Sequence, residues 1–148
     1  MSTKINRPSL TALLLGLGGL IPFVALSSLS ILTSGTHQQT LSFSLLAYGA
    51  TIISFLGAIH WGLTMMEPTP NSLRLIWGVT PSLAAWLSLI FSTQLGLAIQ
   101  CLMLWACFFV DYKTYPTFNL SGWLKLRFAL TLIASVSLFV PLALNIIQ

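Results

Sequence analysis

Five long apolar stretches that carry almost no charge dominate this chain, and they limit its possible folds more than any other feature. A helix needs about 20 mostly apolar residues to cross the hydrocarbon core of a membrane, and most of these stretches reach that length. The sequence therefore predicts an all-α polytopic membrane protein in which five transmembrane helices form a compact bundle. The predicted spans lie at about residues 9–33, 41–66, 73–91, 95–110 and 123–147. Because the connections are short, we expect residues 1–148 to form a single transmembrane helical domain.

Composition supports the same class by a separate route. Hydrophobic residues make up 56% of the chain and charged residues 5%, against about 25% charged residues in an ordinary soluble domain. So few charges cannot cover the surface of a soluble protein. The net charge of +4 is spread thinly along the chain, and no basic cluster indicates nucleic acid as a partner.

The basic residues predict how the chain is oriented in its membrane. With five spans, all of them fall at ends of apolar stretches on one side: Lys4, Arg7, Arg74, Lys113, Lys125 and Arg127. Basic residues accumulate on the cytoplasmic side of membrane proteins, so we expect the N-terminus inside and the C-terminus outside. The N-terminal segment does not resemble an Arg-rich transit peptide. We therefore expect the bacterial inner (cytoplasmic) membrane, or the mitochondrial inner membrane if the source is eukaryotic.

A stripe of small residues in the second span predicts close helix packing. Small side chains allow two helix backbones to approach closely in lipid, where apolar burial alone drives no association between helices. We therefore expect the second span to lie at the centre of the bundle, with an internal partner or another protein against the stripe. The predicted helix-packing residues are Gly49, Ala50, Ser54, Gly57, Ala58 and Gly62.

His60 is the residue most suggestive of a function. An ionisable side chain inside a membrane span is costly to bury and often marks a functional site. A neutral histidine that donates one hydrogen bond to a neighbouring helix explains the residue equally well. Other polar and aromatic residues are expected near the same inner rim, where they could form a vestibule for a ligand. The candidate ligand-binding residues are Tyr48, His60, Trp61, Glu67, Arg74, Trp77 and Asp111.

The sequence offers no set of residues for a cofactor or for catalysis. His37 precedes His60 by 23 residues, which places it about 34 Å away along a helix and excludes haem ligation by both within one protomer. His60, Glu67 and Asp111 would be a sparse metal-binding set without a spacing motif. Phosphate-binding and nucleotide-binding motifs are absent from the sequence. We therefore predict no cofactor, no metal and no catalytic residue.

Several short segments of the first three spans resemble domain-of-unknown-function family 3429, which includes mitochondrial transmembrane protein 69. The segments are Leu45–Ala50, Ser54–Gly57, His60–Gly62, Pro81–Leu87 and Gly16–Pro22. In the last two spans, Asp111 is the one polar position that resembles the family pattern. The resemblance implies a compact multi-span protein of bacterial inner or mitochondrial membranes. It implies no established reaction, cofactor or catalytic residue.

Three functions remain open from the sequence. The first is a non-enzymatic accessory or assembly component that acts through helix–helix contacts, with a membrane-protein partner or in a homo-oligomer, within the lipid bilayer. The second is a binding protein or small transporter for an apolar or amphiphilic ligand, such as a quinone or lipid, with His60 as the polar anchor. The third is a membrane enzyme that uses His60 as acid or base, oriented by Asp111 or Glu67.

Overall fold

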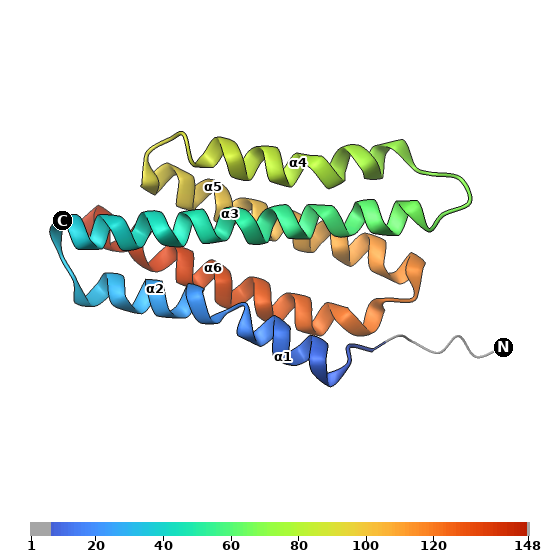
Figure 1. The fold of residues 1–148 in the computed structure, drawn as a ribbon, viewed down its shortest axis with the longest axis horizontal. Coiled ribbons are helices and arrows are strands. Elements are labelled where there is room, and N and C mark those ends of the chain that lie inside the picture. The colour runs from blue at the N-terminus through green and yellow to red at the C-terminus, as the bar shows by residue number, and fades with distance from the viewer. Residues whose placement is uncertain (1–6, 148) are drawn as a thin grey trace.

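The computed structural model describes the backbone of residues 7–147 and the side chains of residues 7–143, and all regular structure in this part of the chain is helical. Figure 1 shows the helices lying side by side along one long axis. In chain order they are α1 (Leu10–Gly18), α2 (Ile21–Leu32), α3 (Gly35–Met65), α4 (Ser72–Ser88), α5 (Thr93–Thr114), the 3-10 helices η1 (Tyr115–Phe118) and η2 (Ser121–Trp123), and α6 (Leu124–Ile147). The all-α prediction is thus confirmed.

Four helical segments among the described residues are long and apolar enough to cross a membrane: Leu10–Leu32, Gly35–Met65, Thr93–Phe118 and Ser121–Ala143. Large apolar side chains such as Leu32, Leu102 and Phe139 project from the outer surface of these segments, as expected for a surface in contact with lipid. Helix α4 has 17 residues and spans about 25 Å. This is shorter than the usual membrane-crossing helix, so the predicted crossing at 73–91, which would bring the total to five, stays a prediction.

Helix α3 lies at the centre of the bundle, as the sequence predicted. It contacts α2, α4, α5 and α6 along its length, and Leu45, Leu46 and Ile53 are fully buried. Its closest approach is to α4, where a Cβ atom added at Gly57 would lie 2.6 Å from the carbonyl oxygen of Gly78. A glycine is therefore required at this crossing, because any side chain would push α4 away.

The predicted small-residue stripe divides between the inside and the outside of the bundle. Gly49, Ala50 and Gly57 are buried, and Ser54 is half-buried. Ala58 and Gly62 are exposed, and a Cβ atom added at Gly62 would meet no other atom within 4 Å. The buried face of α3 instead continues through larger residues, since His60 and Thr64 occupy its next two turns.

The first predicted span, 9–33, consists of two helices rather than one. Helix α1 ends at Gly18 and α2 begins at Ile21. Glycine is a poor helix former, and Pro22 lies in the first turn of α2, where its missing N–H is not needed. The Tyr48 hydroxyl of α3 donates a 2.9 Å hydrogen bond to the Gly19 carbonyl oxygen and so fastens this break to the central helix.

Two predicted connections are shorter than expected. The predicted spans at 9–33 and 41–66 leave residues 34–40 as a connection, but α3 already begins at Gly35, whose positive φ of 64° favours glycine. The predicted spans at 95–110 and 123–147 likewise leave residues 111–122 as a connection, yet α5 continues to Thr114 and carries Asp111 as a buried helical residue. That prediction was wrong because it treated a charged residue as the end of a helix, whereas tertiary partners hold this one inside the bundle.

Candidate functional site

Three ionisable side chains from three helices meet inside the bundle, and we call them the charge cluster: His60 of α3, Asp111 of α5 and Arg127 of α6. Asp111 accepts a 2.7 Å hydrogen bond from Arg127 Nε at its Oδ2 atom, and Arg127 Nη2 lies 2.6 Å from the same oxygen. His60 Nε2 lies 2.9 Å from Asp111 Oδ1. His60 and Asp111 are 1% exposed and Arg127 is 7% exposed. The cluster therefore ties together the three longest helices.

The hydrogen-bond pattern of His60 defines the net charge of the cluster. Its Nδ1 atom is buried without a hydrogen-bond partner. The arrangement that leaves no buried N–H group unpaired is a neutral imidazole whose Nε2–H donates to Asp111, with a bare Nδ1. The carboxylate and the guanidinium then cancel, and the cluster carries no net charge.

Further polar groups surround the charge cluster. The Tyr115 side chain, 4% exposed at the start of η1, interacts with Asp111 and Arg127. Cys107 is buried one helical turn before Asp111. The Thr64 hydroxyl donates a hydrogen bond to the His60 carbonyl oxygen, one helical turn earlier in α3.

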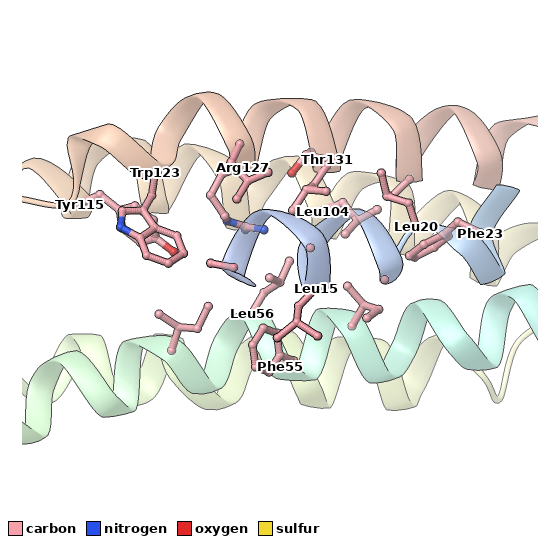
Figure 2. Close-up of a pocket in the computed structure, with 18 of the residues that line it drawn as sticks. Leu15, Leu20, Phe23, Phe55, Leu56, Leu104, Tyr115, Trp123, Arg127 and Thr131 are labelled. Atoms are coloured by element: carbon pink, nitrogen blue, oxygen red, sulfur yellow. The ribbon is translucent and has the colours of Figure 1, made fainter. Parts of the chain in front are cut away.

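A cavity of about 480 Å³ lies beside the charge cluster, between α1, α3 and α6. Figure 2 shows Leu15 of α1, Phe55 and Leu56 of α3, and Arg127 and Thr131 of α6 around it. The lining is almost wholly apolar. It consists of Ala12, Leu15, Gly16, Gly19, Leu20, Phe23, Ile52, Phe55, Leu56, Ile59, Leu104, Tyr115, Leu120, Trp123, Leu126, Arg127, Leu130, Thr131 and Ala134.

The polar side chains that line the cavity come from α6 and the adjoining 3-10 helices. Figure 2 shows the Arg127 side chain descending from α6 into the space above α3. Three of these residues carry buried atoms without a hydrogen-bond partner: Trp123 Nε1, Arg127 Nη2 and Thr131 Oγ1. The close contact of Nη2 with Asp111 can occupy only one of its two N–H groups. Buried polar atoms are normally paired. Ten buried side-chain atoms in the described part of the chain lack a hydrogen-bond partner, and three of them belong to residues that line this one cavity.

Thr131 differs from many hydroxyl residues in the helices. Ser42 and Ser135 also lack a hydrogen-bond partner, but neither of them lines the cavity. The hydroxyls of Ser54 and Thr64, for example, each donate to the carbonyl oxygen four residues earlier. This local bond is the usual way to satisfy a serine or threonine inside a membrane helix. The Thr131 hydroxyl has no such partner, although the residue is 2% exposed. It is therefore free to bind a molecule in the cavity.

The cavity opens through the side of the bundle. Leu15 and Phe55 line it, yet they are 72% and 64% exposed. Both residues belong to candidate membrane-crossing segments. Helix α1 contributes no buried residue and is the most weakly packed wall.

The structure distributes the seven candidate ligand-binding residues over three places. His60 and Asp111 come together in the charge cluster. Tyr48 lies at the α1–α2 break. The remaining four, Trp61, Glu67, Arg74 and Trp77, belong to the α3–α4 hairpin and do not line the cavity.

The hairpin residues are engaged in structural contacts. Glu67 and Arg74 form a 2.6 Å ion pair across the turn, and the Arg74 guanidinium lies 4.8 Å from the centre of the Phe118 ring. Trp61 Nε1 donates to the Leu75 carbonyl oxygen, and Trp77 packs against the core. These contacts fasten the hairpin to itself and to η1.

Sequence reasoning did not identify Arg127, Thr131, Tyr115 and Trp123 as site residues. Arg127 was interpreted only as a charge that orients the chain. One signal could have distinguished Arg127 from Lys125. A buried face of α6 repeats every three or four residues through Thr131, Ala134 and Leu138, and Arg127 shares that face while Lys125 does not.

The fold and the site together define a helical membrane protein with a buried, charge-balanced cluster beside an apolar cavity. Residues 8–143 match the family described as "Protein of unknown function (DUF3429)". The chain belongs to this family, as its sequence motifs indicated.

Two relatives are both called Transmembrane protein 69. The protein of Xenopus tropicalis is 38% identical over 133 residues, which are 86% of this chain and 51% of the relative. That of Mus musculus is 34% identical over 138 residues, 90% of this chain and 56% of the relative. The chain thus spans about half the length of these relatives. No solved structure matches it.

Proposed function

We propose that this chain is a membrane-embedded binding protein for an amphiphilic small molecule. The apolar body of the ligand occupies the cavity, and its polar head contacts Arg127, Thr131 and Trp123. The observation that carries this proposal is the set of unpartnered polar atoms beside an otherwise apolar cavity. Ligand pockets in proteins commonly have volumes of about 300–1,000 Å³, an apolar lining and a few polar groups that orient the ligand.

The geometry favours this function over the two others that the sequence left open. Acid–base catalysis by His60 would require a substrate at its ring, but His60 is 1% exposed and does not line the cavity. It instead supports Asp111, which in turn holds Arg127. Assembly through small-residue contacts is less favoured because the close contact of the predicted stripe at Gly57 is used within the chain against α4.

We further propose an inner membrane as the location, five crossings, and an N-terminus on the inner side. Helix α1 begins at one end of the bundle in Figure 1 and α6 ends at the other, which supports an odd number of crossings. Exposed basic residues such as Lys113 and Lys125 support the orientation, because both lie at the end where α1 begins.

A cavity-filling substitution tests the proposal. Ala12 lines the cavity from α1, which has no buried residue, so Ala12→Phe fills space with little risk to the fold. The neighbouring Thr11 is exposed and does not line the cavity, so Thr11→Phe is the matched control.

Native mass spectrometry of gently extracted protein provides the measurement. We expect the unmodified chain and Thr11→Phe to retain a small amphiphile that Ala12→Phe loses. A chain that carries no small molecule before or after substitution, even when extracted lipids are added back, would refute the proposed function.

A further inference from the structure

We propose that the ligand's head is an uncharged hydrogen-bond acceptor, such as the carbonyl group of a ketone, quinone or ester, and that the site discriminates against anionic heads. This inference rests on the proposed function and names the ligand class of the same cavity. Two independent observations support it, namely the kind of polar atom that is unpaired and the charge balance of the cluster.

The unpaired atoms are hydrogen-bond donors, which favours a ligand head that accepts hydrogen bonds. Trp123 Nε1 and Arg127 Nη2 can only donate hydrogen bonds, and a threonine hydroxyl can do so as well. Both carboxylate oxygens of Asp111 are already used, since one faces His60 and the other faces Arg127. The bare Nδ1 belongs to His60, which does not line the cavity. Among the side chains of the lining, a head with its own N–H or O–H groups would therefore find only the hydroxyl oxygens of Tyr115 and Thr131 as acceptors, whereas a carbonyl oxygen can accept from these donors.

The balance of charge between Arg127 and Asp111 favours a ligand head without a net charge. Arg127 is the only charged residue among the described residues that line the cavity, and Asp111 neutralises it at 2.6 Å. An anionic head would add an uncompensated negative charge to a site whose lining is almost wholly apolar. Such a charge costs far more to bury than a dipole that is hydrogen-bonded. Lys125 cannot supply the missing cation, because its side chain is exposed and it does not line the cavity.

Two probes with the same alkyl chain separate these cases: a long-chain methyl ketone and an alkyl sulfonate, which stays ionised at any usable pH. Each is titrated into lipid nanodiscs that contain the protein, and occupancy is measured by native mass spectrometry. We expect the unmodified chain to bind the ketone about tenfold more tightly or better, where tenfold corresponds to about 1.4 kcal/mol.

Asp111→Asn supplies the second measurement. The substitution keeps the shape of the side chain but leaves the Arg127 cation unbalanced, so we expect the preference to shift toward the sulfonate by at least tenfold. Lys125→Gln removes a cation two residues away on the exposed face of α6 and should leave the preference unchanged.

The outcomes separate the two proposals. If neither probe binds the unmodified chain, the proposed function fails. If both bind with similar affinity, or if the sulfonate binds more tightly to the unmodified chain, the cavity is a binding site but the neutral-head inference is refuted. The preference of the unmodified chain alone decides this, so the test remains valid if Asp111→Asn does not fold.

Discussion

Arg127→Met removes the cation of the charge cluster and leaves its carboxylate inside the bundle. Asp111 would keep its contacts with His60, at 2.9 Å, and with Tyr115, but no cation, while remaining 1% exposed. A methionine side chain is about as long as the arginine stem up to Nε, so the space that the stem occupies stays filled. The volume of the guanidinium end is lost equally when Asp111→Asn is added, so the comparison of the single with the double variant tests charge rather than packing.

The expected loss of stability follows from the burial of the Asp111–Arg127 ion pair. Removing one partner of a buried ion pair costs about 3–5 kcal/mol, because the other charge is left without compensation. Adding Asp111→Asn to Arg127→Met removes that stranded charge, while the amide oxygen can still accept from His60. The double variant should cost only about 1–2 kcal/mol, from amide N–H groups that lack a partner. The second substitution is therefore expected to restore about 2 kcal/mol or more, although it removes another native group.

Reversible unfolding in mixed micelles, with an increasing mole fraction of sodium dodecyl sulfate, measures these free energies. Lys125→Met is the matched control, because Lys125 is an exposed cation on the same helix and should change stability by no more than about 0.5 kcal/mol. A double variant that is less stable than Arg127→Met would refute the reasoning, since it would show that Asp111 is not a stranded charge once the cation is gone.

Three further outcomes follow from the fold. Gly57→Ala should destabilise the bundle by about 1–3 kcal/mol, because its new Cβ would lie 2.6 Å from an α4 carbonyl oxygen. The control Gly62→Ala has open space around the new Cβ and should be neutral or slightly stabilising in the same unfolding assay. Tyr48→Phe should cost about 1 kcal/mol and speed amide hydrogen exchange at the α1–α2 break, and unchanged exchange there would contradict a fastening role. For the five-span topology, cysteines placed at exposed His37 and Lys125 should react with membrane-impermeant reagents from opposite sides, and labelling from one side would exclude it.

The sequence predicted the helices well because the signal for a membrane span is local. Apolar length and flanking polar residues placed each of the long helices to within a few residues, apart from α3, whose start was placed six residues late. Where the prediction failed, the decisive contacts lie far away in sequence. Helix α5 continues past residue 110 because His60 and Arg127 stabilise the Asp111 carboxylate. No window of residues around position 111 contains that information.

The sequence predicted only part of the candidate site, because local signals identify some of its residues and not others. His60 stood out because an ionisable residue is rare in the middle of a span, and Asp111 because acids are rare in this chain. Arg127 did not, because a basic residue near a helix end has an ordinary explanation in membrane topology. The packing of α6 against α5 shows directly that its side chain turns inward while that of Lys125 turns outward.

The length of the cavity favours binding within one leaflet over transport across the membrane. Its lining on η2 and α6 runs from Trp123 to Ala134, which is about 16 Å along the helix axis, or about half the thickness of the hydrocarbon core. Its polar side chains lie toward the Trp123 end, so a bound amphiphile would have the same orientation as the lipids of that leaflet and could enter sideways between α1 and α3. A molecule bound in this way need not turn over. We therefore expect reconstituted protein to bind a fluorescent methyl ketone without speeding its movement between leaflets, as measured by a quencher added to one side. Faster movement that Ala12→Phe abolishes would show that the cavity is part of a transport path instead.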